Sequence, residues 1–258
     1  MTEAVRYEVS GAVATLTLDR PETRNALGRQ TLQALLEALQ RAAADPAARV
    51  VVLTGSGTTF CSGADLTGAG PGGPGFTGGG PALLVEVLEA LLDHPKPTIA
   101  RVQGHVAGGG NGLVAACDLA VAVASARFAF SEVRIGVAPA VVAIVCLRVM
   151  SARDAAELML TGERVWAERA RSAGLLTAVV EPDALDATVA AWAEQLSLAG
   201  PVAVAATKEL LRTVPALGRS AAFAWTAQLS AALFDSPEAA EGIAAFLARR
   251  PASWAVPG

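Results

Sequence analysis

Apolar and polar residues alternate with a period of two at the start of the chain. Between residues 12 and 18, Val13, Thr15 and Thr17 alternate with Ala14, Leu16 and Leu18, and a turn at Ser10 and Gly11 separates this run from residues 6–9. Alternation on both sides of a short glycine turn is typical of a β-hairpin. The chain is therefore predicted to open with two antiparallel strands.

The spacing then changes to that of a helix. Helical spacing is shown by Leu27, Thr31, Leu32, Leu35, Leu36 and Leu39, and Asp45 followed by Pro46 ends the pattern. A short β-branched run at residues 50–54 is typical of a strand buried in a parallel sheet. The order of strand and then helix returns at residues 98–103 and 108–117, and another strand is expected at residues 119–123. This order predicts an α/β core.

From residue 152 onward the signals are mainly helical. Glycine and proline separate five expected helices, at residues 153–160, 167–173, 184–196, 202–211 and 220–233. We predict a core at residues 1–198 and a helical C-terminal region at residues 199–258. The most apolar run, residues 137–147, is too short to span ~30 Å of hydrocarbon at about 1.5 Å per residue, and is expected to lie in the core.

Residues 67–80 differ in composition from the rest of the chain, because more than half of them are glycine. Such a segment buries too little apolar surface to offset the entropy lost when it is ordered. It is either a plain linker or a lid or pocket wall. The second interpretation is favoured, since the motifs on both sides of it are expected to serve one site.

Composition and charge exclude several classes of function. The 258 residues are 53% apolar, which is enough for a large core, and the formal net charge of −4 gives no basic surface for nucleic acid or an anionic membrane. The three cysteines, Cys61, Cys117 and Cys146, show no paired spacing, and the first residues show no signal-peptide pattern. These features predict a cytoplasmic protein.

The common nucleotide, metal and hydrolase motifs are incomplete. The glycine runs at residues 55–57 and 108–110 do not complete G-x-G-x-x-G, and G-x-x-x-x-G-K-[ST] does not occur. The two histidines, His94 and His105, have no cysteine or carboxylate cluster at ligand spacing, so no metal site is expected. The G-x-S-x-G motif does not occur either, which makes serine hydrolysis a minor alternative. No metal and no redox cofactor are expected.

Two motifs of small residues each follow a predicted strand. They are FCSGADL at residues 60–66 and GHVAGGGNGL at residues 104–113, and the second opens a helix. Small residues let backbone amides approach a ligand, and amides at a helix N-terminus are unpaired and lie at the positive end of the helix dipole. Two converging N–H groups would form an oxyanion hole. The alternative is that the glycines only allow a strand and a helix to pack closely.

A series of segments, in order, resembles the crotonase (enoyl-CoA hydratase/isomerase) superfamily. These are residues 20–27, 60–66, 95–100, 108–120, 128–140, 160–163 and 236–246. The resemblance implies a spiral of βαβ units with a helical C-terminal region that serves oligomerisation and the CoA pocket. It also implies assembly as a homotrimer or homohexamer, and an acyl-CoA substrate bound between the two glycine motifs. Coenzyme A would be part of the substrate and not a cofactor.

The resemblance also implies roles for individual residues. The thioester oxygen would accept hydrogen bonds from the N–H groups of Ala64 and Gly109, and Glu132 would be the acid/base group. The further residues implied in CoA binding are Arg24, Ala26, Asp65, Leu66, Thr67, Phe234 and Arg250. A neighbouring subunit is an alternative source of the last two, and Arg24 could equally be a solvated charge.

Glu132 corresponds to one of the two acid/base glutamates of the hydratases. Its apolar neighbours disfavour the charged form and should raise its pKa. Gly112 occupies the position of the other glutamate, and the preceding Asn111 cannot act as a base. Two carboxylates would hold a water for addition across a double bond, whereas one can move a proton from C2 to C4. This departure slightly favours isomerisation over hydration, and both reactions stay open.

Three classes of function are therefore compatible with the sequence. The leading one is an enzyme of fatty acid metabolism, a lyase or an isomerase, that acts on unsaturated acyl-CoA. The others are thioester hydrolysis or decarboxylation by the same fold, and a non-catalytic CoA-binding protein. Packing or hydrogen bonding is favoured for His105, an ion pair for Arg134, and a place in the core for Cys61.

Overall fold

The computed structural model describes residues 3–67 and 79–255 of the chain, and its strands form two sheets. The larger sheet has the order β1-β2-β3-β5-β7-β10, and the smaller has the order β4-β6-β8-β9. The strands are β1 Val5–Ser10, β2 Val13–Leu18, β3 Val50–Gly55, β4 Thr59–Cys61, β5 Thr98–Val102, β6 His105–Ala107, β7 Leu119–Val123, β8 Arg127–Ala129, β9 Val165–Trp166 and β10 Ala178–Val180. Residues 68–78 of the predicted lid or pocket wall lie outside the described residues.

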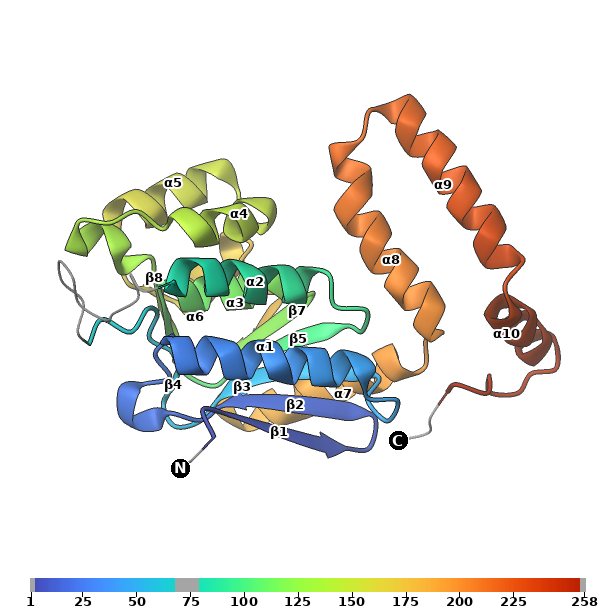
Figure 1. The fold of residues 1–258 in the computed structure, drawn as a ribbon, viewed down its shortest axis with the longest axis horizontal. Coiled ribbons are helices and arrows are strands. Elements are labelled where there is room, and N and C mark those ends of the chain that lie inside the picture. Colours follow the sequence, from blue (N-terminus) through green and yellow to red (C-terminus); the bar gives the residue numbers. More distant parts are fainter. Residues whose placement is uncertain (1–2, 68–78, 256–258) are drawn as a thin grey trace.

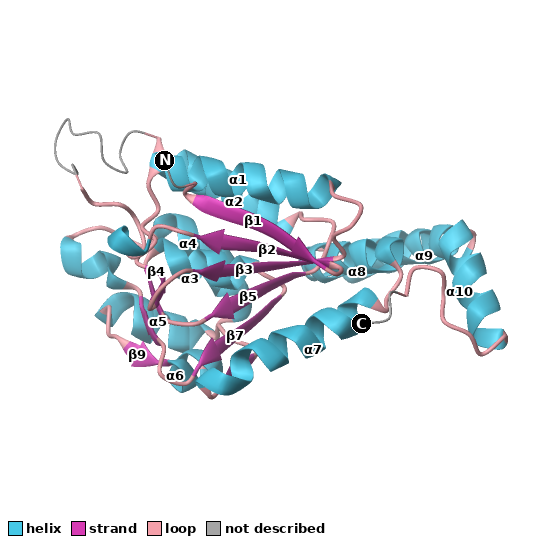
Figure 2. Ribbon diagram, turned by 90° about the horizontal axis from the view of Figure 1, so that it is seen from below, coloured by secondary structure: helices cyan, strands magenta, loops and turns pink. Residues whose placement is uncertain are grey.

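The larger sheet begins with the predicted hairpin and continues as parallel strands. β1 pairs antiparallel with β2, in a register that joins Val5 to Leu18, whereas β2, β3, β5, β7 and β10 are parallel neighbours. Every residue of β3 is buried, as expected for a parallel strand that is covered on both faces. Figure 2 shows the strands side by side, with α1 next to β1 and α7 next to β7. The α/β fold predicted from the sequence is confirmed.

The helices cover the sheets and then extend beyond them. They are α1 Arg29–Ala44, α2 Gly80–Leu92, α3 Gly109–Ala116, α4 Ala140–Val149, α5 Ala152–Thr161, α6 Ala167–Ser172, α7 Leu185–Ser197, α8 Pro201–Thr213, α9 Arg219–Phe234 and α10 Pro237–Leu247, with short 3-10 helices η1 Pro21–Thr23, η2 Ser131–Ile135, η3 Pro182–Ala184 and η4 Val214–Ala216. The five helices expected after residue 152 are all present, with ends shifted by one or two residues. In α5 the local sequence explains both ends, because Ser151 caps the first turn and Gly162 adopts the left-handed conformation after the last.

The apolar run at residues 137–147 does not lie wholly in the core, which corrects the prediction. It forms most of α4, of which one face, with Val142, Val145 and Cys146, is buried. Val137, Ile144 and Leu147 are 53%, 68% and 56% exposed. The reason is that α4 packs on α3 and α2 with one side only. Composition alone does not distinguish such a helix from a fully buried one.

The C-terminal helices extend away from the sheets. In Figure 1, α8 runs away from the core, α9 runs back after a turn, and α10 lies at the far end of the molecule. The predicted boundary at residue 198 falls between α7 and α8. Among the described helices, none is by itself both long and apolar enough to cross a bilayer, although Pro182–Ser197 and Pro201–Ala216, bent by 107°, meet these criteria together.

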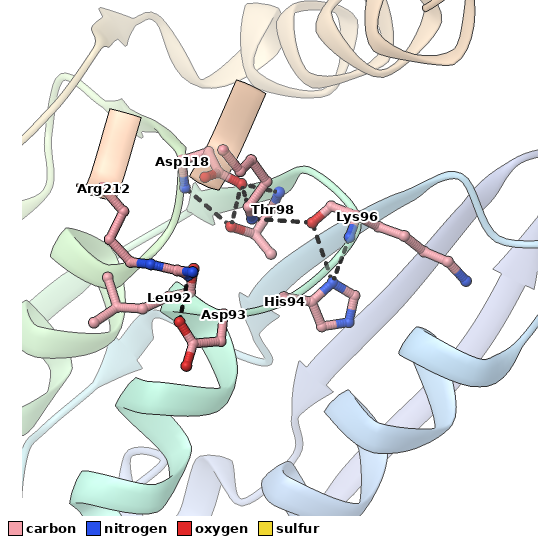
Figure 3. A network of polar contacts seen from close by, with 8 residues as sticks. Leu92, Asp93, His94, Lys96, Thr98, Asp118 and Arg212 are labelled. Atoms are coloured by element: carbon pink, nitrogen blue, oxygen red, sulfur yellow. Dashed lines mark hydrogen bonds and ion pairs between the residues drawn. The ribbon is translucent and has the colours of Figure 1, made fainter. Parts of the chain in front are cut away.

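A polar network joins α8 to the ends of β5 and β7 (Figure 3). The Lys208 ammonium lies 2.5 Å from Oδ2 of Asp118, and its side chain is only 10% exposed. The same carboxylate oxygen accepts hydrogen bonds from the N–H and the hydroxyl of Thr98, at 2.7 and 2.9 Å. One turn later in α8, Arg212 pairs with Asp93 and donates to the carbonyl of Leu92. The network therefore fixes the C-terminal extension against the core.

Replacing Lys208 with methionine is expected to lower the free energy of unfolding by about 1.5–3 kcal/mol, because the partly buried Asp118 loses a hydrogen bond from a charged donor. Chemical unfolding followed by circular dichroism measures this change. The control is Arg171→Met, which removes an exposed ion pair with Glu168 and should have a much smaller effect. Equal effects of the two substitutions would contradict the prediction.

Candidate active site

The first glycine motif is positioned by a short parallel bridge between Leu27 and Ala64. The N–H of Leu27 donates to the carbonyl of Gly63 at 2.8 Å, and the N–H of Asp65 donates to the carbonyl of Leu27 at 3.2 Å. A parallel bridge of this kind uses the groups on either side of Ala64. The N–H of Ala64 itself points away from Leu27 and is not part of this pairing.

The second motif contributes the N-terminus of α3. Gly109 is the first residue of this helix, so its N–H has no partner within the helix. A Cβ on Gly109 would lie 2.8 Å from Cδ1 of Leu27, which shows how tightly the Leu27 side chain packs against this glycine. Leu27 thus holds Ala64 through its backbone and Gly109 through its side chain.

The two motifs also contact each other directly. Gly63 has a φ of +89°, and a Cβ added there would lie 3.0 Å from the carbonyl oxygen of Ala107 and 3.3 Å from Cα of Gly108. Gly108 has a φ of +50° and faces Gly63 from the other side. A side chain at either position would be strained and would press on the opposite backbone. The chain therefore brings the segments carrying the Ala64 and Gly109 N–H groups together, as the oxyanion-hole interpretation requires.

Glu132 lies beside this contact, on η2. Its Oε1 is 3.5 Å from the point that a Cβ on Gly108 would occupy. Its Oε2 is buried and has no hydrogen-bond partner among the described residues. Burial raises the pKa of Glu132, which is the direction predicted from its apolar neighbours. A carboxylate that has one unpartnered oxygen among the described residues and a raised pKa, next to two N–H groups, is suited to move a proton.

The space beside Gly112 is apolar. A Cβ at this position would lie 2.7 Å from Cγ1 of Val142 and 3.5 Å from Cδ2 of Leu88. Val142 and Leu88 are 3% and 4% exposed, on α4 and α2. The place where the resemblance expects a second glutamate is therefore filled by carbon atoms. The face of α4 that carries Val142 also carries Cys146, whose pKa is raised by burial and then by the charge of Glu132.

Most of the other predicted CoA-binding residues lie on the two segments that the Leu27–Ala64 bridge joins. The N–H and hydroxyl of Thr67 donate to Oδ1 of Asp65, and these hydrogen bonds lower the pKa of Asp65. Leu66 is 54% exposed, and Arg24 is exposed next to the partly buried Ala26. The carbonyl of Arg24 accepts a hydrogen bond from the N–H of Ser62. The structure thus places these residues near the oxyanion motif, and their contacts with CoA stay a prediction.

Phe234 and Arg250 are not brought to this site within one chain. Phe234 ends α9 and is 72% exposed, and Arg250 forms an ion pair with Glu241 of α10. Figures 1 and 2 both place α9 and α10 at the end of the molecule opposite β4, which ends at the first glycine motif. A role of these two residues in CoA binding therefore requires a neighbouring subunit.

The contacts of His105, Arg134 and Cys61 agree with structural roles. His105 is exposed and its Nδ1 lies 3.2 Å from the N–H of Arg127. Arg134 donates to the carbonyl of Thr161 at 2.7 Å, and among the described residues it does not form the expected ion pair. Cys61 is a buried free thiol, and burial raises its pKa to about 12. Within residues 3–67 and 79–255 there is no cluster of three potential metal ligands.

Three residues were not assigned these contacts from the sequence: Leu27, which aligns the two motifs, Val142, which fills the space at Gly112, and Asn111, whose side-chain amide donates to the carbonyl of Ala129. Leu27 lies in residues 20–27, a segment that resembles the family, but the resemblance did not imply a role for this residue. Val142 and Asn111 act through contacts with residues distant in sequence, for which the sequence gives no signal.

Comparisons with known proteins agree with this architecture. The sequence model of the enoyl-CoA hydratase/isomerase family matches residues 8–256. The chain is 34% identical to the (E)-benzylidenesuccinyl-CoA hydratase of Thauera aromatica, over 95% of this chain and 96% of that protein. It is 33% identical to the carnitinyl-CoA dehydratase of Salmonella arizonae, over 98% and 99%. A crystal structure of enoyl-CoA hydratase from Mycobacterium smegmatis superimposes with a TM-score of 0.91 at 35% identity, covering 98% of this chain and 99% of that one.

Replacing Glu132 with glutamine is expected to lower kcat by about 10²-fold or more, because the amide cannot accept a proton. Binding of acyl-CoA, followed by calorimetry, should stay within about threefold. In the native protein, kcat/KM should fall as the pH is lowered through the pKa of Glu132, and this fall should begin at a higher pH than for an ordinary glutamate, since burial raises that pKa.

The matched control is Glu181→Gln, at an exposed glutamate outside the site. It should leave both the rate and the pH profile unchanged. A Glu132→Gln protein that keeps the native rate would remove Glu132 from the mechanism.

Proposed function

The chain belongs to the enoyl-CoA hydratase/isomerase family of the crotonase superfamily, and on that premise we propose that it moves a proton on an unsaturated acyl-CoA thioester. In this proposal the enolate oxygen accepts hydrogen bonds from the N–H groups of Ala64 and Gly109. The observation that supports it most directly is the carboxylate of Glu132 beside Gly108, with one buried oxygen that has no partner among the described residues.

The proposed reaction begins with polarisation of the thioester carbonyl by the two N–H groups. Polarisation acidifies the C–H bond at C2, and the Glu132 carboxylate takes that proton while the negative charge moves to the thioester oxygen. Protonated Glu132 then delivers the proton to C4, and the double bond moves from C3–C4 to C2–C3. No atom is gained or lost. An oxyanion donor contributes about 10²–10³ in rate, and general acid/base catalysis about 10²–10⁴.

We favour isomerisation because of the space beside Gly112. Hydration adds a water, and a second polar group would have to hold that water near C3. The described atoms nearest to a Cβ at Gly112 are carbons of Val142 and Leu88, which offer neither a donor nor an acceptor. A single carboxylate is sufficient to move a proton between two carbons of the same substrate.

Hydration is the second candidate, because the relatives compared above are named hydratases and dehydratases. In that case Glu132 alone would activate the water, or backbone groups would hold it. Thioester hydrolysis and decarboxylation have no support of this kind. A non-catalytic CoA-binding protein would not need the Glu132 carboxylate at its cost of burial.

We also propose assembly as a homotrimer or homohexamer in the cytoplasm. Several large apolar side chains of the C-terminal helices are more than two-thirds exposed in the single chain, namely Leu211, Phe223, Phe234, Phe246 and Leu247. Exposed apolar side chains in this number on three consecutive helices support a partner that covers part of these helices. The three cysteines are free and buried, which agrees with a reducing compartment. The acidic balance still favours neither nucleic acid nor a membrane as a partner.

The native protein is expected to convert a 3-enoyl-CoA to its 2-enoyl isomer faster than it hydrates a 2-enoyl-CoA of the same length. Gly112→Glu alone should fail to raise hydration, because the new side chain would collide with Val142. The double substitution Gly112→Glu with Val142→Ala frees that space and should raise the ratio of hydration to isomerisation by about tenfold or more. Both rates are measured by absorbance and chromatography on matched substrates.

Val142→Ala by itself is the control for the cavity, and it should not change the ratio. If the native protein hydrates crotonyl-CoA efficiently and does not isomerise 3-enoyl-CoA, isomerisation is wrong and hydration takes its place. The proposed oxyanion hole of Ala64 and Gly109 would serve either reaction, so that result does not affect it.

Light scattering of the purified protein should give three or six times the mass of one chain. Phe223→Asp places a charge on the exposed apolar surface of α9 and should shift the protein toward smaller species, since a buried unpaired charge opposes association. The control Arg219→Asp changes the charge on the same helix without removing an apolar side chain, and it should leave the mass unchanged. A native protein of one-chain mass would exclude the assembly.

A further inference from the structure

Asn111 is a fully buried amide at the start of α3. It is 0% exposed, and its Nδ2 donates to the carbonyl oxygen of Ala129 at 2.8 Å. Its Oδ1 is also buried, and among the described residues it has no hydrogen-bond partner. A buried acceptor without a partner destabilises the folded state. The amide is therefore not explained by stability alone.

The carbonyl that Asn111 binds connects the two halves of the candidate site. Ala129 O also accepts a hydrogen bond from the N–H of Gly108, at 3.1 Å. Gly108 directly precedes Gly109, whose N–H has no partner within α3, and Ala129 ends β8, three residues before Glu132. One oxygen thus receives two donors from the start of α3 and belongs to the segment that carries the carboxylate.

We propose that Asn111 is a positioning residue, which fixes Glu132 relative to the N–H of Gly109 through the carbonyl of Ala129. This inference rests on the function proposed above. The hydrogen bond from Gly108 belongs to the pairing of β6 with β8, and the second donor, one turn further along α3, adds a restraint on the direction of the Ala129 carbonyl. Small displacements of a proton-transfer group are costly, since a misplacement of about 1 Å can lower a rate on the order of 10²-fold.

A purely structural role predicts a different outcome from a positioning role. Asn111→Leu keeps a similar volume, removes the unpartnered Oδ1, and leaves Ala129 O with the donor from Gly108. We therefore expect the midpoint of thermal unfolding to stay the same or rise. We expect kcat to fall by about 10- to 100-fold, with KM within about threefold of the native value. A lower unfolding midpoint with an unchanged kcat would overturn the proposal.

Asn111→Asp supplies a test with a pH signature. A protonated aspartic acid can donate to Ala129 O as the amide does, whereas its carboxylate cannot, and burial raises the pKa of such a group. The variant should approach native activity near about pH 5 and fall below it as the pH rises, while the native protein keeps its activity. A variant whose activity stays in constant ratio to the native one across this range would contradict the role of the donor.

The matched control is Thr98→Val. Thr98 is 1% exposed and bonds to Asp118, away from the candidate site. Its loss should lower the unfolding midpoint and leave kcat and KM unchanged. Hydrogen–deuterium exchange adds a readout that needs no turnover. Asn111→Leu should accelerate exchange in residues 131–136, and Thr98→Val should not.

These readouts separate failure of the inference from failure of the proposed function. If the native protein neither turns over enoyl-CoA nor exchanges the C2 protons of butyryl-CoA in D2O, the proposed function fails, and exchange in residues 131–136 alone decides whether Asn111 restrains Glu132. If the native protein is active and Asn111→Leu changes neither kcat nor exchange in that segment, the inference fails and the proposed function stands.

Discussion

The close approach of Gly63 and Gly108 is the contact on which the candidate site depends. Each glycine has a positive φ, and each lies where a side chain of the other would be. The contact brings together two segments more than forty residues apart in the sequence, each with one backbone N–H that its own secondary structure does not use. The proposed donors are therefore backbone atoms held by the smaller sheet and a helix, and they would need little reorganisation when charge develops on a bound oxygen.

Helix α4 determines the surroundings of Gly112 and Glu132. Its buried face lies over Gly112 through Val142 and near Glu132 through Cys146. The first contact excludes a polar group from one side of the site, and the surrounding burial raises the pKa of the carboxylate on the other. The opposite face of the same helix is exposed, with Ile144 and Leu147 on it. One short helix thus contributes to the site with its buried face alone.

The sequence predicted the elements whose periodicity is long enough to read. The hairpin, α1, β3, β5, α3, β7 and the five helices α5 to α9 were expected close to where they occur. The strands β4, β6, β8 and β9 have only two or three residues, too few for alternation to show. The helix α2 has apolar residues at helical spacing, at Leu84, Val87, Leu88 and Leu91, but no prediction was made for it from the sequence.

The candidate site was predictable where its residues belong to local motifs and not where they act through long-range contacts. Ala64 and Gly109 lie in glycine motifs, and Glu132 in a matched segment, so each could be named from the chain. The packing of Val142 on Gly112 joins residues thirty positions apart, and the hydrogen bond from Asn111 to Ala129 joins residues eighteen apart. Neither spacing belongs to a helix or strand pattern, so only the tertiary structure reveals these partners.

The packing of Val142 on Gly112 bears on the choice between isomerisation and hydration. With Val142 in place, a side chain at residue 112 is excluded by a contact of 2.7 Å to its first carbon. With Gly112 in place, a smaller residue at 142 would leave a cavity, which is itself destabilising. A larger residue at 112 alone would produce a clash, and a smaller residue at 142 alone would leave a cavity, so either change by itself is destabilising. The apolar character of this side of the site is therefore a property of the pair, and a second carboxylate can enter only if both positions change together.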